Sequence, residues 1–317
     1  MELLIQHGNK VFSPVVQEGI TWTTERKGCP GELHFKVVKD DVIAFQEGDA
    51  VRLKVNGANI FYGFVFQKKR SKDHIITVTA YDQLRYLKNK DTYVYENKTA
   101  GEFIKMIASD FKLQTGTIEN TGFKIASRIE ENTSLFDMIQ NALDLTLENK
   151  KQMYVMYDDF GKITLKGLDS MQLNLLIDEE TGENFDYTSS INDKTYNKVK
   201  LTYDNEETGK REVYIAQHGE NMNQWGVLQH FDTLQKGENG QAKANALLSL
   251  YNKKTRNLTI KNAFGDTRVR AGSMVGVMLY LGDLQVQNMM LVEKCKHEFK
   301  ESQHFMNLTL RGGEFIA

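Results

Sequence analysis

Apolar and polar residues alternate along much of the first part of the chain. The alternation, or a run of β-branched and aromatic residues, marks the segments 19–26, 31–38, 49–55, 58–66 and 74–81. Asn56-Gly57 separates two of these segments, and this dipeptide readily adopts the positive φ angles of a type I′ hairpin turn. Period-two alternation is typical of half-buried strands, and short strands with frequent turns predict a small barrel or sandwich.

The apolar period changes to a helical one near residue 95. Thr99 and Glu102 fit a capping box, in which a hydroxyl and a carboxylate bond free backbone N–H groups at a helix start. Apolar residues then follow three and four positions apart over 100–111, which predicts an amphipathic helix. A second helix is predicted from Ser134 onward, and a third over residues 240–253.

Strand-like segments surround and follow these helices. Two pairs are predicted to form hairpins, 153–158 with 162–167 and 197–203 with 211–217, and the closing residues are again strand-like. The pattern predicts a mainly β protein with a helix-containing α+β insert. The expected division is a first β-barrel domain over 1–92, the α+β insert over 93–188, and a second β-rich domain over 189–317 with helix 240–253 and closing barrel strands 258–317.

The two ends of the chain resemble each other in order and spacing. The matching segments are Gly48–Leu53 with Gly272–Val277, Phe64–Lys69 with Leu291–Lys296, and Ile75–Ala80 with Phe305–Leu310. The partners lie 224, 227 and 230 residues apart, so the matches keep their order with small drifts. Any two antiparallel meanders share weak matches of this kind, but the common order favours a duplication. A duplication implies two similar β-barrels per chain, and a trimer of such chains would present six barrels in a ring.

Composition narrows the class of protein. The 317 residues include 40 Lys and Arg against 42 Asp and Glu, a formal charge of −2, and 40% are hydrophobic. This is enough apolar material for a sizeable core, whereas a protein that grips the phosphates of nucleic acid normally carries a basic excess. Cys29 and Cys295 lie far apart and form no disulfide framework or metal-ligand motif. We expect no signal peptide, no membrane span and folding in a reducing cytoplasm.

Three local patterns resemble known sites but have simpler interpretations. Asp159-Phe160-Gly161 spells the kinase magnesium motif, yet no glycine-rich loop or HRD accompanies it, so a hairpin turn is favoured. Segment 204–209 begins like a calcium loop, but isoleucine stands where a bidentate glutamate is required. His297, Glu298 and His304 are a conceivable metal site without an HExxH motif, so an unliganded role is favoured. We expect no cofactor and no metal.

A basic stretch is the one candidate contact site. It comprises Lys68, Lys69, Arg70 and Lys72, between two predicted strands. One interpretation is a charged hairpin tip that stays in water and discourages the addition of strands at a sheet edge. The alternative is a loop that docks against an acidic partner.

Longer segments carry a resemblance to a known family. They are FYGFV (61–65), AYDQLRYL (80–87), TAGEFIKMIASDFKL (99–113), SLFDMIQNALDLT (134–146), YNKVKLTYDN (196–205) and LVEKCKHEFKESQHFMNLTLRGG (291–313). With these segments the chain resembles the baseplate hub proteins of contractile phage tails, the group of late control protein D and the T-even-type hub. The likeness is greatest to the hubs of PBSX-like defective phages and related tailocins.

The resemblance implies a fold, a role and partners. It implies two tube-protein-like barrels per chain and a homotrimer that adapts the sixfold tail tube to the threefold central spike. The implied partners are further copies of the chain, the tail tube or tube-initiator protein, the central spike protein and the baseplate wedge proteins. The implied role is structural, without enzymatic activity, in a phage or phage-like tail baseplate assembled in a bacterial host.

A different class of protein remains as an alternative. It is a tail-associated cell-wall glycan-binding module or peptidoglycan hydrolase, with residues 93–188 as the active part. Tyr154, Tyr157 and Phe160 supply aromatic side chains for that role, although they suit a packed hairpin equally well. A cleft with two carboxylates in unequal environments would favour this alternative.

Overall fold

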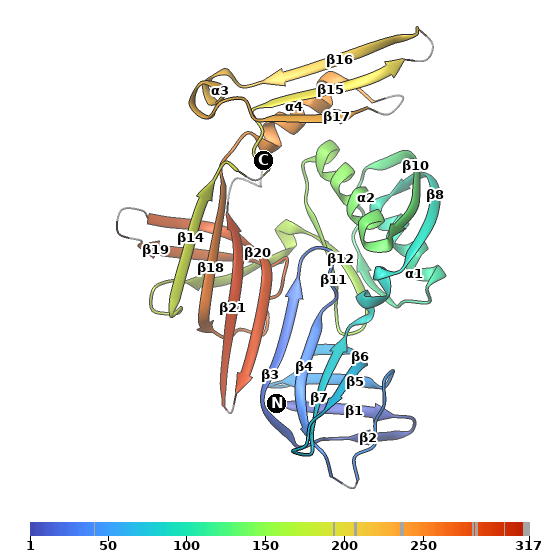
Figure 1. The fold of residues 1–317 in the computed structure, drawn as a ribbon, viewed down its shortest axis with the longest axis vertical. Coiled ribbons are helices and arrows are strands. Elements are labelled where there is room, and N and C mark those ends of the chain that lie inside the picture. The colour runs from blue at the N-terminus through green and yellow to red at the C-terminus, as the bar shows by residue number, and fades with distance from the viewer. Residues whose placement is uncertain are drawn as a thin grey trace.

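The N-terminal residues form an antiparallel sheet (Figure 1). The computed structural model describes residues 1–40, 42–192, 194–205, 208–234, 238–280, 282, 285–300 and 302–312. The strands of this first half are β1 (Glu2–His7), β2 (Lys10–Phe12), β3 (Val16–Glu25), β4 (Glu32–Val38), β5 (Ala50–Val55), β6 (Ala58–Arg70) and β7 (Ile75–Tyr81), in the sheet order β2-β1-β5-β6-β7-β4-β3. Buried side chains alternate along β4, β5 and β7, which confirms the period-two prediction. Asn56 and Gly57 have φ angles of 51° and 81°, as a type I′ turn requires.

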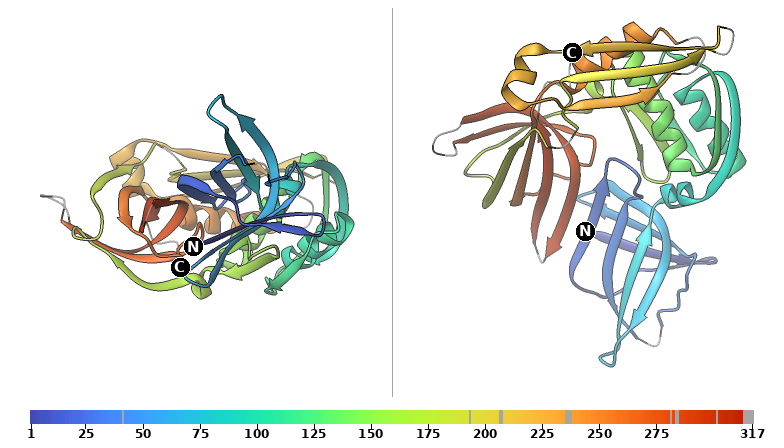
Figure 2. Two further views of the ribbon diagram at one scale, coloured as in Figure 1. Left: turned by 90° about the horizontal axis from the view of Figure 1, so that it is seen from below. Right: turned by 45° about the horizontal axis from the view of Figure 1, so that its top comes forward.

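The C-terminal residues build a second sheet with an equivalent strand order. Its strands are β13 (Gln172–Ile177), β14 (Asn184–Ser190), β18 (Thr255–Phe264), β19 (Met274–Tyr280), β20 (Gln285–Lys300) and β21 (Gln303–Gly312), in the order β13-β19-β20-β21-β18-β14. β3 pairs antiparallel with β20, from Ile20 opposite Phe299 to Glu25 opposite Lys294. The two halves therefore join, edge to edge, into one sheet of thirteen strands in the described part of the chain (Figures 1 and 2).

The two halves share register as well as order. Phe64 is the residue at which β6 passes from pairing with β5 to pairing with β7. Leu291 does the same in β20, and its partners in β19 and β21 lie 224 and 230 residues after those of Phe64. A register shift follows in both strands, at Val65–Gln67 and at Val292–Lys294. The predicted repeat is thus present in strand connectivity, in register and in a shared β-bulge.

The expected barrels are open sheets rather than closed ones. Within the described residues, neither β2 and β3 in the first half nor β13 and β14 in the second half pair with each other. The physical reason is that β3 pairs with β20 of the other half instead of closing its own sheet. The halves also differ at one edge, because β13 runs parallel to β19 whereas β1 runs antiparallel to β5. Each half is a curved sheet around its own core (Figure 2).

An α+β module lies between the two halves in sequence. Its elements are η1 (Gln83–Lys88), β8 (Lys90–Thr99), α1 (Ala100–Asp110), β9 (Thr115–Ile118), β10 (Lys124–Ser134), α2 (Leu135–Lys150), β11 (Tyr154–Asp158), β12 (Ile163–Gly167) and η2 (Leu168–Met171). The capping box is confirmed: Thr99 Oγ1 accepts from the N–H of Glu102, whose carboxylate accepts from the N–H of Thr99 at 2.7 Å. Phe103, Ile104 and Ile107 of α1 are buried in the module core.

A further helix-containing unit interrupts the second half. It comprises β15 (Lys198–Asn205), β16 (Lys210–Gln217), α3 (Gly219–Trp225), β17 (Gln229–Thr233) and α4 (Gly240–Tyr251) around a small core of its own. Lys243 on α4 lies 3.8 Å from Glu148 on α2, so the two units touch. The domain division at residues 92 and 188 stays a prediction; β13 and β14, which fall before residue 188 or at it, pair with strands of the second half.

Loss of the α1 cap gives a local test of this architecture. Replacing Thr99 by alanine is expected to lower the free energy of unfolding by about 1 kcal/mol, because a backbone N–H at the helix start loses its acceptor. Urea denaturation followed by circular dichroism measures the change. Thr117→Ala, at an exposed position in β9, is the matched control and should be near neutral. Equal losses in the two variants would contradict the capping role.

Candidate assembly interface

The basic stretch occupies the end of β6 and the turn toward β7. Lys68 is held by its own chain: it donates to the carbonyl oxygen of Phe45 and lies 4.5 Å from the centre of the Phe45 ring. Lys69, Arg70 and Lys72 are exposed and make no hydrogen bond or ion pair with any residue that the structure describes. Three cations are therefore available to an acidic partner, and the docking role of the stretch stays a prediction.

Strand edges lie open beside this stretch and in the second half. Residues 67–70 of β6 extend past the end of β5 and pair only with β7, as far as the described residues go. β14 likewise pairs only with β18 over residues 184–190. Such edges present unpaired N–H and C=O groups to which another strand can add.

The junction of the two halves shows how an added strand is held in this protein. Trp22 in β3 stacks on His297 in β20, with 4.8 Å between the ring centres and 17° between the ring planes. His297 is fully buried, and its Nε2 lies 2.8 Å from the carbonyl oxygen of Val269. Its Nδ1 lies 2.9 Å from Nε2 of His304. Burial lowers the pKa of His297 to about 3, so the stacked imidazole is neutral at ordinary pH.

The two histidines are therefore packing groups of the junction. Glu298, the third member of the conceivable metal site, turns to Lys296 at 2.8 Å and to Asn307 at 3.1 Å. Among the described residues, no group of three or more His, Cys, Asp and Glu side chains has the arrangement of metal ligands.

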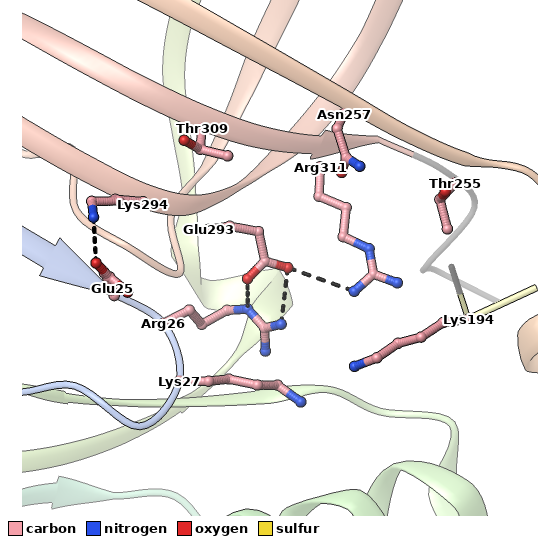
Figure 3. A pocket seen from close by; sticks show the side chains of 10 residues that line it. All are labelled: Glu25, Arg26, Lys27, Lys194, Thr255, Asn257, Glu293, Lys294, Thr309 and Arg311. Atoms are coloured by element: carbon pink, nitrogen blue, oxygen red, sulfur yellow. Dashed lines mark hydrogen bonds and ion pairs between the residues drawn. The ribbon is translucent and has the colours of Figure 1, made fainter. Parts of the chain in front are cut away.

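A charged hollow of about 370 Å³ opens beside the junction (Figure 3). Arg26 forms a bidentate pair with Glu293, with Nε–Oε2 and Nη2–Oε1 distances of 2.7 and 2.9 Å. Arg311 lies 3.7 Å from the same carboxylate, and Lys27 and Lys194 reach toward the same space in Figure 3. Burial alone would raise the pKa of Glu293, but the two guanidinium groups hold it below its usual value. The hollow thus fastens the end of β3 to β20 by charge.

Removal of Arg26 tests this fastening. Arg26→Ala is expected to lower the free energy of unfolding by about 3 kcal/mol, because Glu293 keeps only the more distant Arg311. The double variant Arg26→Ala/Glu293→Ala should lose clearly less than the sum of the two single losses. Urea unfolding of the four proteins gives the coupling energy, and a coupling near zero would show that the pair adds nothing to the junction.

The aromatic residues of the glycan-site alternative are used in packing. The Arg270 guanidinium lies 4.3 Å from the ring centre of Tyr157. Phe160 packs on Tyr62, with 5.8 Å between ring centres, and the hydroxyl of Tyr154 donates to a backbone carbonyl oxygen. These rings are parts of local contacts rather than a row of exposed platforms for sugar rings.

Two carboxyl groups in this region are enclosed. Asp82 accepts from the N–H groups of Gly31 at 2.8 Å and Leu84 at 3.0 Å, and Asp158 accepts from that of Gly161 at 2.7 Å. Burial raises the pKa of Asp158 to about 6. Burial, and then the nearby Asp158, raise the pKa of Asp82 well above its usual value. Both residues are only 6% exposed, whereas a glycosidase needs its two carboxyl groups open to the substrate.

The remaining sequence patterns are turns. Phe160 and Gly161 have φ angles of 49° and 87°, which confirms a hairpin turn between β11 and β12. In the calcium-like loop, Asp204 pairs with Arg211 at 2.6 Å, and residues 206 and 207 lie outside the described residues. Sequence reasoning missed the junction residues Trp22 and His297, because no local pattern marks two strands that meet from opposite ends of a chain.

The helices of the described chain include none that is long and apolar enough to cross a membrane. A family model described as YQBQ-like matches residues 20–311. Phage-like element PBSX protein XkdQ of Bacillus subtilis (strain 168) is 31% identical, over 93% of this chain and 92% of that protein.

Solved structures share the fold at low sequence identity. The 43 kDa tail protein of prophage MuSo2 from Shewanella oneidensis has a TM-score of 0.70 at 11% identity, covering 98% of both chains. The E. coli c3393 protein, a type VI secretion system component described as similar to the T4 tail proteins gp27 and gp5, has a TM-score of 0.58 at 11% identity, covering 99% of this chain and 78% of that one. With a family match over nearly its whole length and a shared fold, the chain belongs to the YQBQ-like family.

Proposed function

We propose that this protein is the hub of a contractile phage-type baseplate, a structural component of a phage or prophage tail and not an enzyme. Three copies form a homotrimer that adapts the sixfold tail tube to the threefold central spike. Its partners are the tail tube or tube-initiator protein, the central spike protein and the surrounding wedge proteins. The protein is made in the bacterial host and assembled into a virion-like or tailocin particle.

The observation that carries the proposal is the repeated sheet unit. Two units of equivalent order and register are joined edge to edge through β3 and β20 in one chain. Three chains then supply six units, which is the number that a sixfold tube needs from a threefold layer. A threefold ring requires heterologous contacts, because isologous ones close at two copies. The duplicated unit supports such a contact, since its two outer ends are different strands.

The relatives support the same role. XkdQ is a protein of the phage-like element PBSX, and the Shewanella structure is that of a prophage tail protein. The E. coli neighbour is described as similar to T4 tail proteins. All of them are proteins of tails or tail-like machines, and none is described as an enzyme.

The oligomeric state tests the proposal. Light scattering over a range of concentrations is expected to reach the mass of three chains of 36.3 kDa each. Averaged electron micrographs should then show a threefold ring with six similar lobes around a channel. A closed dimer, a ring of six chains, or the mass of one chain at every concentration would contradict the hub assignment.

A wall-digestion assay separates the hub from the hydrolase alternative. The purified protein is expected to release no soluble fragments from peptidoglycan, because Asp82 and Asp158 are enclosed. Turnover that a single carboxylate substitution abolishes would instead favour the hydrolase.

A further inference from the structure

We propose that the ring closes by strand addition, with β14 of one copy pairing antiparallel with residues 67–72 of the next. Tyr187 then lies opposite Arg70 of the neighbouring copy. The inference rests on the proposed function and adds to it the strands, the register and the charges of the contact. It follows from treating the internal junction between β3 and β20 as the pattern for the contact between chains.

The internal junction uses a specific stretch of β20. β19 pairs with β20 only up to Leu291, and β3 then takes the vacated side of β20 from Lys294 to Phe299. In the first half, β5 pairs with β6 only up to Phe64, and the same side of β6 is open beyond it in the described chain. The first half therefore has the acceptor edge of the junction without its added strand.

The open β14 is the counterpart of β3. Trp22 of β3 lies opposite Leu33 of β4, and Tyr187 of β14 lies opposite Leu258 of β18. The other neighbours of Leu33 and Leu258, in β7 and β21, are separated by the repeat distance of 230 residues. Tyr187 thus occupies the place of Trp22, and the outer edge of β14 is the edge that β3 uses on β20.

The same comparison sets the register. Arg70 lies opposite Ile76 in β7, and His297 lies opposite Met306 in β21, again 230 residues apart. Arg70 is therefore the counterpart of His297. Since Trp22 faces His297 inside the chain, Tyr187 faces Arg70 between chains. An arginine over a tyrosine ring is a favourable cation–π pair, as the stacked rings are at the internal junction.

The two edges have opposite charge. Segment 178–190 contains five Asp and Glu residues and no Lys or Arg, whereas 67–72 contains four Lys and Arg and no acidic residue. In the inferred register Asp186 falls between Arg70 and Lys72 of the neighbour. Asp186 is exposed and has no partner among the described residues, and the same is true of those two cations. Charges of opposite sign across the contact favour this pairing over the addition of a like edge.

Disulfide trapping tests the register. One chain carries Thr188→Cys and another carries Lys69→Cys, the counterparts of the facing residues Thr23 and Lys296. Both chains also carry Cys29→Ser, because Cys29 is partly exposed and Cys295 is buried. Mild oxidation of the mixture is expected to give a covalent dimer with one chain of each kind. Neither variant alone should cross-link, because the contact is heterologous.

A shifted pair is the matched control. Ser190→Cys mixed with Lys69→Cys keeps the same strand face but lies two residues out of register. Its cross-linking should be at least about tenfold lower, because diagonal neighbours are farther apart than a disulfide reaches. Light scattering of the same samples separates the outcomes. A trimer that cross-links only in the shifted pair, or in neither pair, overturns this register and leaves the hub role intact, whereas the absence of a trimer counts against the hub role itself.

A charge exchange gives a second readout. Arg70→Glu is expected to raise the concentration needed for trimer formation by about tenfold. Adding Asp186→Arg to the same chain should restore association, because each contact then again joins opposite charges. An Asp186→Arg addition that weakens association further would overturn the pairing.

Discussion

Alanine in place of Trp22 is expected to lower the free energy of unfolding by about 3 to 5 kcal/mol, the largest single loss in this protein. Trp22 is 3% exposed, stacks on the fully buried His297 and lies 5.5 Å from the Arg270 guanidinium. Its removal leaves a cavity between two strands that only this contact and the neighbouring charge pair fasten. Because the junction couples the halves, we expect the single urea transition to broaden or split in the variant.

The second tryptophan supplies the control for this prediction. Trp225 lies in α3, a short helix in which no residue is buried. Trp225→Ala is expected to change the free energy of unfolding by less than about 1 kcal/mol. A similar loss in both variants would mean that Trp22 acts as an ordinary surface ring and that the halves are held together elsewhere.

The stability of the protein is expected to fall by about 3 kcal/mol as the pH rises from about 4 to about 7, through ionisation of Asp158. Burial raises the pKa of this carboxyl to about 6 in the folded chain, above its usual value of 3.8. The folded state therefore binds the proton more tightly than the unfolded state. The stabilisation is complete below the unfolded pKa and is lost as the pH rises through the folded one. Asp82, whose pKa is also raised by burial, acts in the same direction.

Asp158→Asn isolates this effect. The amide oxygen still accepts from the N–H of Gly161, so the hairpin is kept while the titrating group is removed. Urea unfolding at several pH values should show a flatter profile than that of the unaltered protein. Asp204→Asn is the control, because Arg211 lowers the pKa of Asp204 and its titration falls below this pH range. An unchanged profile in Asp158→Asn would rule out Asp158 as the source of the pH dependence.

Local features of this protein were predictable because each depends on a few neighbouring residues. The strands of the first half follow from period-two alternation, and the start of α1 follows from Thr99 and Glu102. The turns at Asn56-Gly57 and Phe160-Gly161 follow from residues that tolerate positive φ. The repeat was also visible, because equivalent strands kept their order and spacing.

The structure alone decided how the strands from distant parts of the chain meet. β14 carries an ordinary polar alternation and lies within the predicted insert, yet it pairs with β18. Nothing near Trp22 in sequence indicates that His297 will cover it. The basic stretch was predicted as a possible contact, but its three unpartnered cations beside an open edge of β6 became evident only in the folded chain.

The sequence by itself determined the elements, the turns and the duplication, since these depend on local backbone preferences and on side-chain periodicity. Only the tertiary structure decided that β3 joins β20, that the two sheets remain open and that β14 and β6 keep free edges. The physical reason is that any strand edge offers the same N–H and C=O groups to any other strand. The choice of partner is therefore made by packing, such as that of Trp22 on His297, between residues far apart in sequence.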